Sequence, residues 1–150
     1  MYARILVPVD GSETATRGLE EAIRLAQALG SSLKLVHIVD DSALALNPEA
    51  GVAAAPLVAD FAEGGRQVLE EASALAAARG AQVETALHEN FTGRVAGLIV
   101  DEAKQWGAEL IVMGTHGRSG IRHAVLGSDA EAVVHASHVP VLLVPAPGRK

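Results

Sequence analysis

Short runs of consecutive apolar residues alternate along this chain with longer segments whose apolar residues recur at helical spacing. The first run, at residues 5–9, contains no polar residue, which is typical of a strand that is buried on both faces. Strands that alternate with helices favour a parallel sheet with helices packed against both of its faces. The pattern therefore predicts the α/β class.

Five segments are expected to be strands, at residues 5–9, 33–39, 82–87, 110–113 and 139–144. Four segments of helical periodicity lie between them, at residues 13–29, 57–79, 92–106 and 128–136. Ser12 and Thr92 have hydroxyl side chains suited to capping two of these helices, and Gly30 is suited to ending the first. Polar residues alternate with apolar ones in the third strand, as at the edge of a sheet. Pro140 has no N–H, so the last strand starts there or lies at an edge.

The length of 150 residues predicts a single domain over residues 1–150. Residues 42–56 are rich in alanine, lack a clear periodicity and predict a long mobile loop. The tail at residues 145–150 is expected to be frayed. Within the second helix, the pair Gly64-Gly65 weakens the N-terminal half.

Composition excludes several classes of site and partner. The absence of cysteine excludes disulfides, thiolate zinc sites and thiol catalysis. A net charge of −6 and an aromatic content of 3% argue against nucleic-acid binding, which uses basic surfaces and aromatic stacking. No apolar run approaches the roughly 20 residues of a membrane span, and the N-terminus does not read as a signal peptide. We expect a cytoplasmic protein without a membrane or nucleic-acid partner.

The segment before the last helix differs in charge from the rest of the chain. Residues 110–128 contain no acid, although the whole chain is acidic, and they include Arg118 and Arg122. The glycines of this segment let backbone N–H groups face a ligand. Gly127-Ser128 at a helix start adds N–H donors, a hydroxyl and the positive end of the helix dipole. Together these features predict an anion site, for which phosphate is the usual occupant.

The expected topology predicts where this glycine-rich segment lies in the fold. In an open parallel sheet, ligands bind beyond the carboxyl ends of the strands, where the strand order reverses. The first and fourth strands would flank that crevice and place Asp10 opposite the glycine-rich segment. The segment is neither a Walker A sequence nor a Rossmann Gly-x-Gly-x-x-Gly, so the usual P-loop hydrolysis machinery is absent. The alternative is a long connecting loop whose glycines only serve turns.

Histidines and serines give weaker signals. The six histidines offer no set of three with metal-ligand spacing. His37, inside an apolar strand, is expected to be a hydrogen-bonded histidine in or near the core, whereas His116 has the best claim to touch a ligand. The serines of the glycine-rich and capping segments have no histidine and acid partners at a spacing that indicates nucleophilic catalysis. We therefore predict no catalytic residue.

The spacing Gly114-x2-Gly117-x9-Gly127-Ser128 resembles the ATP-binding signature of the universal stress protein family. Similar agreement is found after the first strand (residues 8–12), at the end of the second (residues 37–40) and in the last (residues 140–144). The resemblance covers essentially the whole chain. It implies an open five-stranded parallel sheet of order 3-2-1-4-5, binding of ATP or a related adenine nucleotide such as ADP or AMP, and homodimers paired through strand 140–144.

The resemblance also implies a set of site residues. Phosphates and ribose would be surrounded by Gly114, Gly117, Arg118, Gly127 and Ser128. The adenine would lie against Pro8, Val9 and Ile38, with Met113 beneath. Asp10 would face the ribose or a phosphate-bound Mg²⁺ or Mn²⁺. The remaining residues of the glycine-rich segment complete the site, namely Thr115, His116, Ser119 and Gly120.

The sequence departs from the family pattern at two places. Residues 88–93 lack the Gly-x-Pro often found before the third helix. Asp129 follows Ser128 where many relatives have an apolar or neutral residue, and we include it in the site. An acid suits the positive end of a helix dipole, but it would also compete with a phosphate tail.

We therefore expect a nucleotide-responsive regulatory dimer of the universal stress protein type, in which ordering of residues 42–56 reports nucleotide occupancy to a partner. Two alternatives belong to other classes. One is a slow, metal-dependent ATPase, although no residue is an obvious base for activating water. The other is a dimerisation or adaptor module that works without nucleotide. Binding of ATP, ADP and AMP, or its absence, distinguishes the adaptor from the other two.

Overall fold

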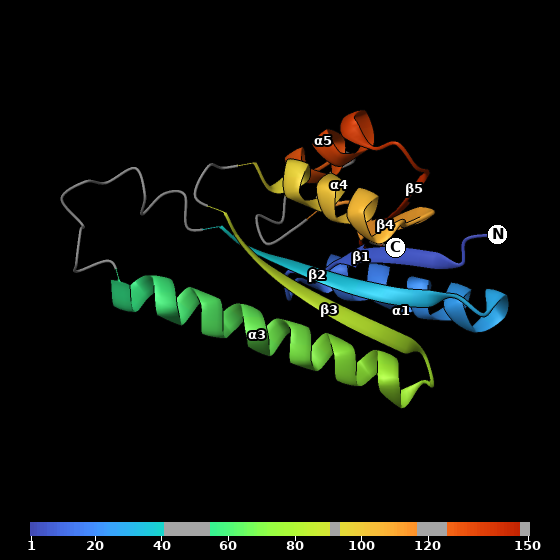
Figure 1. Cartoon of the computed structure of the whole chain (residues 1–150), viewed down its shortest axis with the longest axis horizontal. Coiled ribbons are helices and arrows are strands. Elements are labelled where there is room, and N and C mark those ends of the chain that lie inside the picture. Colours follow the sequence, from blue (N-terminus) through green and yellow to red (C-terminus); the bar gives the residue numbers. More distant parts are fainter. Residues whose placement is uncertain (41–54, 91–93, 117–125, 148–150) are drawn as a thin grey trace.

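The computed structural model describes residues 1–40, 55–90, 94–116 and 126–147. Its elements follow the predicted alternation of strands and helices (Figure 1). In chain order they are β1 (Arg4–Pro8), α1 (Glu13–Leu29), β2 (Ser32–Asp40), α3 (Ala55–Ala78), β3 (Gln82–Asn90), α4 (Val95–Trp106), β4 (Leu110–Gly114), α5 (Ser128–Ala136) and β5 (Val141–Val144). The strands form one sheet of order β3-β2-β1-β4-β5, and every pairing is parallel. The predicted fold class and strand order are confirmed.

Helices cover both faces of the sheet, and each covered face has its own apolar core. Helices α1 and α3 pack on one face, and α4 and α5 on the other (Figure 1). Alternate residues of β1 enter the two cores, since Ile5 and Val7 face α1 and α3 whereas Leu6 lies among residues of α4 and α5. All three are completely buried. This two-sided burial explains why the run at residues 5–9 contains no polar residue.

The first helix begins and ends as its sequence predicts. The Oγ atom of Ser12 accepts a hydrogen bond from the N–H of Ala15 at 3.2 Å, which satisfies one donor of the first turn. Gly30 ends the helix in the left-handed conformation, with φ of +71°, and its N–H donates to the carbonyl of Ala26. The N-terminus of α1 lies only a short turn after the end of β1, since β1 ends at Pro8 and α1 begins at Glu13.

Two predicted boundaries are wrong by a few residues. Strand β3 continues three residues beyond the predicted end, because residues 88–90 pair in register with residues 38–40 of β2. Helix α4 begins at Val95 with Arg94 in the N-cap position and no side-chain cap. Thr92, the predicted cap, lies outside the described residues and two positions before that N-cap. The edge positions of β3 and β5 agree with the sequence, and β5 begins immediately after Pro140.

The glycine pair in α3 does not interrupt that helix. Helix α3 starts at Ala55, earlier than predicted, and continues through Gly64 and Gly65 to Ala78. A Cβ atom at Gly65 would lie 2.7 Å from Cδ2 of His37, whereas nothing lies within 4 Å of one at Gly64. The absence of a side chain at Gly65 thus permits close packing of α3 on the sheet. The helix predicted over residues 57–79 is confirmed, and the low helix propensity of the glycine pair does not break its N-terminal half.

Part of the predicted loop belongs to α3. Residues 55 and 56 are helical, and the rest of the predicted loop, residues 42–54, lies outside the described residues. In the predicted tail, residues 145–147 have no regular secondary structure, and residues 148–150 lie outside the described part. None of the described helices combines the length and the apolar character that crossing a membrane requires.

Candidate functional site

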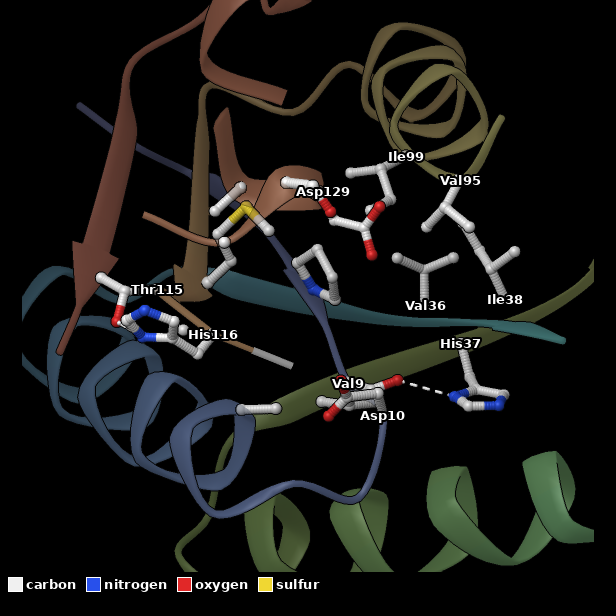
Figure 2. Close-up of a pocket in the computed structure, with 17 residues that line it drawn as sticks. Val9, Asp10, Val36, His37, Ile38, Val95, Ile99, Thr115, His116 and Asp129 are labelled. Atoms are coloured by element: carbon white, nitrogen blue, oxygen red, sulfur yellow. Dashed lines mark hydrogen bonds between the residues drawn. The ribbon is translucent and has the colours of Figure 1, made fainter. Parts of the chain in front are cut away.

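A cleft of about 300 Å³ opens at the carboxyl ends of β1, β2 and β4, on the side covered by α4 and α5 (Figure 2). This is the position that the expected strand order predicts for a ligand. The described residues that line the cleft come from six elements and the turns between them. They are Pro8, Val9, Asp10, Ala15, Val36, His37, Ile38, Val95, Ile99, Met113, Gly114, Thr115, His116, Gly127, Ser128, Asp129 and Ala130.

One end of the cleft is apolar. Val36 and Ile38 lie two residues apart on β2 and project from the same face of the strand. Val95 and Ile99 lie four residues apart on α4 and face these strand residues, as Figure 2 shows. Val36 and Ile99 are almost completely buried. The four side chains form two aliphatic walls that can enclose a flat apolar group.

The other end is polar, and its backbone is held from three directions. The N–H of Thr115 donates to the carbonyl of Val144 on β5 at 3.1 Å, and the carbonyl of Thr115 accepts from the N–H of Gly127 at 2.8 Å. The hydroxyl of Thr14, in the first turn of α1, donates to the carbonyl of His116. The end of β4 is thus tied to β5, α5 and α1. Figure 2 places Thr115 and His116 at the opposite side of the cleft from Val95 and Ile38.

The N-terminus of α5 opens on this polar end. Gly127 is its N-cap residue and provides no side-chain cap, and Ser128 begins the helix with an exposed side chain. The N–H groups of a first helical turn have no acceptors inside the helix, and they carry the positive end of the helix dipole. N–H groups in this position can donate to an anion, which is the reason why the sequence predicted an anion site here. Asp129, in the same turn, also lines the cleft.

The turn between β1 and α1 closes the floor of the cleft. Oδ1 of Asp10 accepts a hydrogen bond from the N–H of Ser12 at 2.9 Å, and Gly11 between them has φ of +81°. Nδ1 of His37 lies 2.7 Å from the carbonyl oxygen of Val9. Because a carbonyl can only accept, Nδ1 of His37 is the donor. His37 is 8% exposed, so the prediction of a hydrogen-bonded histidine near the core is confirmed.

Two glycines assigned to the ligand have a packing role that the sequence did not reveal. A Cβ atom at Gly114 would lie 2.7 Å from the backbone of Thr14, and one at Gly127 would lie 2.7 Å from the carbonyl oxygen of Thr115. Cβ atoms essentially never approach other atoms so closely. Both glycines therefore allow backbone segments to meet around the cleft, whatever the cleft binds.

The structure brings together every predicted site residue that it describes. These residues are Pro8, Val9, Asp10, Ile38, Met113, Gly114, Thr115, His116, Gly127, Ser128 and Asp129. The other four, Gly117, Arg118, Ser119 and Gly120, lie outside the described residues. Within the described ranges, no group of three or more histidine or acidic side chains could hold a metal ion.

Sequence reasoning missed six residues of the cleft, namely Ala15, Val36, His37, Val95, Ile99 and Ala130. Val36 carried a signal, because it lies two residues before the predicted Ile38 on the same face of its strand. Val95 and Ile99 lie in the segment for which the sequence predicted helical periodicity. What was missing was the position of α4 over β2, which only tertiary packing decides.

Comparisons with known proteins agree on one family. The model of the universal stress protein family matches residues 1–145 of this chain. Among curated proteins, universal stress protein MJ0531 of Methanocaldococcus jannaschii is similar to it, with 32% identity over 151 residues. That match covers 100% of this chain and 86% of the relative.

Solved structures of similar proteins have the same fold. MJ0577 of Methanocaldococcus jannaschii matches with a TM-score of 0.86 and 26% identity, over 99% of each chain. The universal stress protein of Archaeoglobus fulgidus in complex with dAMP matches with a TM-score of 0.66 and 25% identity, over 95% of this chain and 98% of that one. A universal stress protein in complex with cAMP matches with a TM-score of 0.67 and 27% identity, over 96% of this chain and 97% of that one.

Proposed function

The chain belongs to the universal stress protein family, and we propose that it binds an adenine nucleotide, with ATP, ADP and AMP as candidates, in the cleft between β1 and β4. One observation carries the proposal: a single cleft joins an aliphatic slot at one end to an uncapped helix N-terminus at the other. An adenine nucleotide has the same division into an apolar flat base and a charged phosphate. Similar proteins solved with cAMP and dAMP support this ligand class.

The base would lie at the apolar end. Ile38 and Val95 would contact opposite faces of the planar base, and Met113 would lie below the base. Aliphatic side chains hold a base by burying its apolar faces, with a gain of about 25 cal/mol for each Å² removed from water. This arrangement fits a chain whose aromatic content is 3%.

The phosphate would lie against the N-terminus of α5. N–H groups of its first turn and the hydroxyl of Ser128 would donate to phosphate oxygens. Asp10, which lines the cleft from the β1–α1 turn, would accept from a ribose hydroxyl or bind a divalent cation carried by the phosphates. We propose that Gly117, Arg118, Ser119 and Gly120 complete the phosphate end, on the resemblance to the family signature.

We also propose that the protein is a nucleotide-responsive regulatory homodimer that pairs through β5. This strand is an edge of the sheet. Its Leu142 is 37% exposed, and Val134 on the adjacent α5 is 43% exposed. An edge strand with unpaired backbone groups and exposed apolar side chains favours association with a second copy.

Isothermal titration calorimetry of the full chain with ATP, ADP, AMP and GTP tests the nucleotide proposal. We expect binding of the adenine nucleotides at one site per chain, and weaker binding of GTP. Mass spectrometry of the denatured protein would identify any adenine nucleotide that copurifies. Flat titrations with all adenine nucleotides would overturn the proposal and favour the adaptor module. Metal-dependent phosphate release that disappears in Asp10→Ala would instead favour the slow ATPase.

A pair of variants at Ile38 tests the position of the base. Ile38→Asp introduces a charge into the aliphatic slot and is expected to weaken adenine-nucleotide binding at least tenfold. Ile38→Val removes one methylene and keeps the wall apolar, so it is the matched control and should bind within a few-fold of wild type. Equal affinities for the two variants, with both folded by circular dichroism, would place the base elsewhere.

A further inference from the structure

A second cavity lies between α1 and α3, below the turn that closes the floor of the cleft. Its volume is about 240 Å³, and it is lined by the end of β1, the β1–α1 turn, the first turns of α1 and the middle of α3. In Figure 2, α3 passes below Val9 and Asp10, on the side that faces away from Ile38. The second cavity is therefore on the other side of the turn from the cleft, although Val9 and Ala15 line both.

Small residues leave this space where the two helices meet. Gly11 in the turn, Ala15 on α1 and Ala72 on α3 all line the second cavity. None of the three has a side chain larger than a methyl group, which leaves room between the helix backbones. Pockets for drug-sized ligands have volumes of roughly 300–1,000 Å³. The second cavity is smaller, so it suits a small molecule and not a nucleotide.

The inner wall of the second cavity is aliphatic. Val9 and Leu19 are 5% and 2% exposed, and both belong to the core between the sheet and these two helices. Val68 and Leu75 lie seven residues apart on α3, so they project from the same face of that helix and bound the cavity on its other side. An aliphatic chain that enters would remove its own apolar surface and that of these residues from water, which favours binding.

The rim of the second cavity carries an acid and a hydroxyl. Glu71 on α3 and Thr16 on α1 line the cavity, and both residues are exposed. Within the described part of the chain, no basic side chain forms an ion pair with the carboxylate of Glu71. Oγ1 of Thr16 donates to the carbonyl of Ser12 at 3.0 Å, and the same oxygen can accept a further hydrogen bond. The rim thus offers a negative charge and side-chain oxygen acceptors to a ligand.

We propose that the second cavity binds a primary amine joined to a short aliphatic chain. The chain would lie along the aliphatic wall, and the amino group would lie at the rim. A primary amine is protonated at neutral pH, like the side chain of lysine. Its N–H donors match the carboxylate of Glu71 and the hydroxyl oxygen of Thr16, and the remaining donor faces water. A ligand with a carboxylate in place of the amine would be repelled by Glu71.

Titration of the isotope-labelled full chain with n-hexylamine at neutral pH, followed by NMR, measures this binding and locates it. We expect a dissociation constant of about 1 mM or lower, as is reasonable for a ligand of this size. The largest changes in chemical shift should occur at the backbone amides of Gly11, Thr16 and Ala72. Hexanoate, which has the same chain length and the opposite charge, should bind more weakly.

One pair of variants tests the charge at the rim. Glu71→Gln keeps the shape of the side chain and should weaken binding of n-hexylamine about 2- to 5-fold, the value of an exposed ion pair. The same variant should bind the uncharged n-hexanol as wild type does. Glu70→Gln changes the neighbouring exposed acid, which does not line the cavity, and is the matched control. Its affinity for n-hexylamine should equal that of wild type.

A second pair tests the aliphatic part. Ala72→Leu fills the second cavity and should weaken binding of n-hexylamine and of n-hexanol at least tenfold. Ala74→Leu makes the same change at an exposed position of the same helix that does not line the cavity, and it should bind both as wild type does. Circular dichroism shows whether each variant is folded. The pair at Glu71 and Glu70 decides the proposal if Ala72→Leu does not fold.

Three outcomes would overturn the proposal. Wild-type protein whose spectrum does not change at millimolar n-hexylamine has no such site. Shift changes confined to residues of the cleft would place the amine there instead. Equal binding of n-hexylamine by wild type and Glu71→Gln, with hexanoate bound as tightly, would show that the acid does not select the ligand. The titrations contain no nucleotide, so these results are distinct from any failure of the proposed function.

Discussion

Nζ of Lys34 lies 2.5 Å from Oε1 of Glu102, in the layer between the sheet and α4 where the neighbouring side chains are apolar. The two side chains are only 15% and 8% exposed. Nε2 of His88, on β3, lies 2.7 Å from the other oxygen of the same carboxylate. One acid of α4 therefore connects that helix to two strands.

This ion cluster continues the wall of the cleft. Lys34 lies two residues before Val36 on the same face of β2, and Glu102 lies three residues after Ile99 on α4. The charged pair and the aliphatic pair therefore belong to the same interface between strand and helix. We infer that the cluster fixes how α4 lies over β2, and with it the width of the apolar slot.

Glu102→Gln should lower the free energy of unfolding by about 2 kcal/mol, because it leaves Lys34 without its counter-charge in a largely buried place. Chemical denaturation at neutral pH measures this value. Asp101→Asn changes the neighbouring exposed acid of the same helix and is the control, with an expected change of less than about 0.5 kcal/mol. Equal stabilities for the two variants would contradict the role of the cluster.

The same carboxylate predicts a pH dependence of stability. Burial of Glu102 by itself raises its pKa, but hydrogen bonds from Lys34 and His88 and attraction to their charges outweigh burial, so the pKa lies below its ordinary value. The unfolded chain then binds this proton more readily, and the stabilisation is present above the unfolded pKa and is lost as the pH falls through the folded one. Between about pH 5 and pH 3, where a carboxyl of ordinary pKa titrates, wild type should lose stability more steeply than Glu102→Gln. Parallel curves would show that the carboxylate is not coupled to folding.

The two glycines of α3 should respond in opposite directions to the same substitution. Gly64→Ala adds a methyl group in open space and should stabilise the helix by about 0.5–1 kcal/mol. Gly65→Ala places one 2.7 Å from the ring of His37 and should destabilise the protein by about 1–3 kcal/mol. Thermal unfolding of both variants measures the difference, and a stabilising Gly65→Ala would mean that α3 can move away from the sheet freely.

Neighbouring substitutions at the start of α5 should separate packing from binding. Gly127→Ala meets the carbonyl of Thr115 and should cost about 1–3 kcal/mol of stability. Ser128→Ala leaves the helix intact and removes one donor to phosphate, so it should weaken ATP binding roughly 2- to 12-fold, the value of one hydrogen bond. Denaturation and calorimetry on the same samples check both. Loss of stability in Ser128→Ala would contradict this division.

The proposed dimer predicts a difference between the two edges of the sheet. Leu142→Lys, on β5, should raise the dimer dissociation constant at least tenfold, because a charge replaces an apolar contact and hinders edge pairing. Thr85→Lys, exposed on the opposite edge strand β3, is the control and should not change it. Sedimentation velocity across a range of concentrations measures both. An unchanged association state in Leu142→Lys would exclude β5 as the interface.

The elements and the polar end of the cleft were predictable because their signals are local. An unbroken apolar run marks β1, a hydroxyl cap and a glycine mark the two ends of α1, and Gly127-Ser128 marks the start of α5. Each signal depends on a few consecutive residues. The strand order then followed from the resemblance, and it places the carboxyl ends of β1 and β4 beside each other.

Contacts between distant segments were not predictable in this way. The Thr115–His116 pair is adjacent in sequence, but its fixed backbone depends on Thr14, which lies about a hundred positions earlier. The close packing of α3 on the sheet likewise depends on the absence of a side chain at Gly65, beside the ring of His37. In neither case does the local sequence show which distant residue will lie against the segment.

The sequence by itself determined which segments become strands and helices, because propensity and capping are properties of short segments. For the same reason it predicted an anion site at the start of α5, where backbone donors are local too. Only the tertiary structure decided that Gly114 and Gly127 serve close packing and that α4 supplies an aliphatic wall of the cleft. The physical reason is that these features depend on distances between residues far apart in the chain, which are set when all the layers pack together.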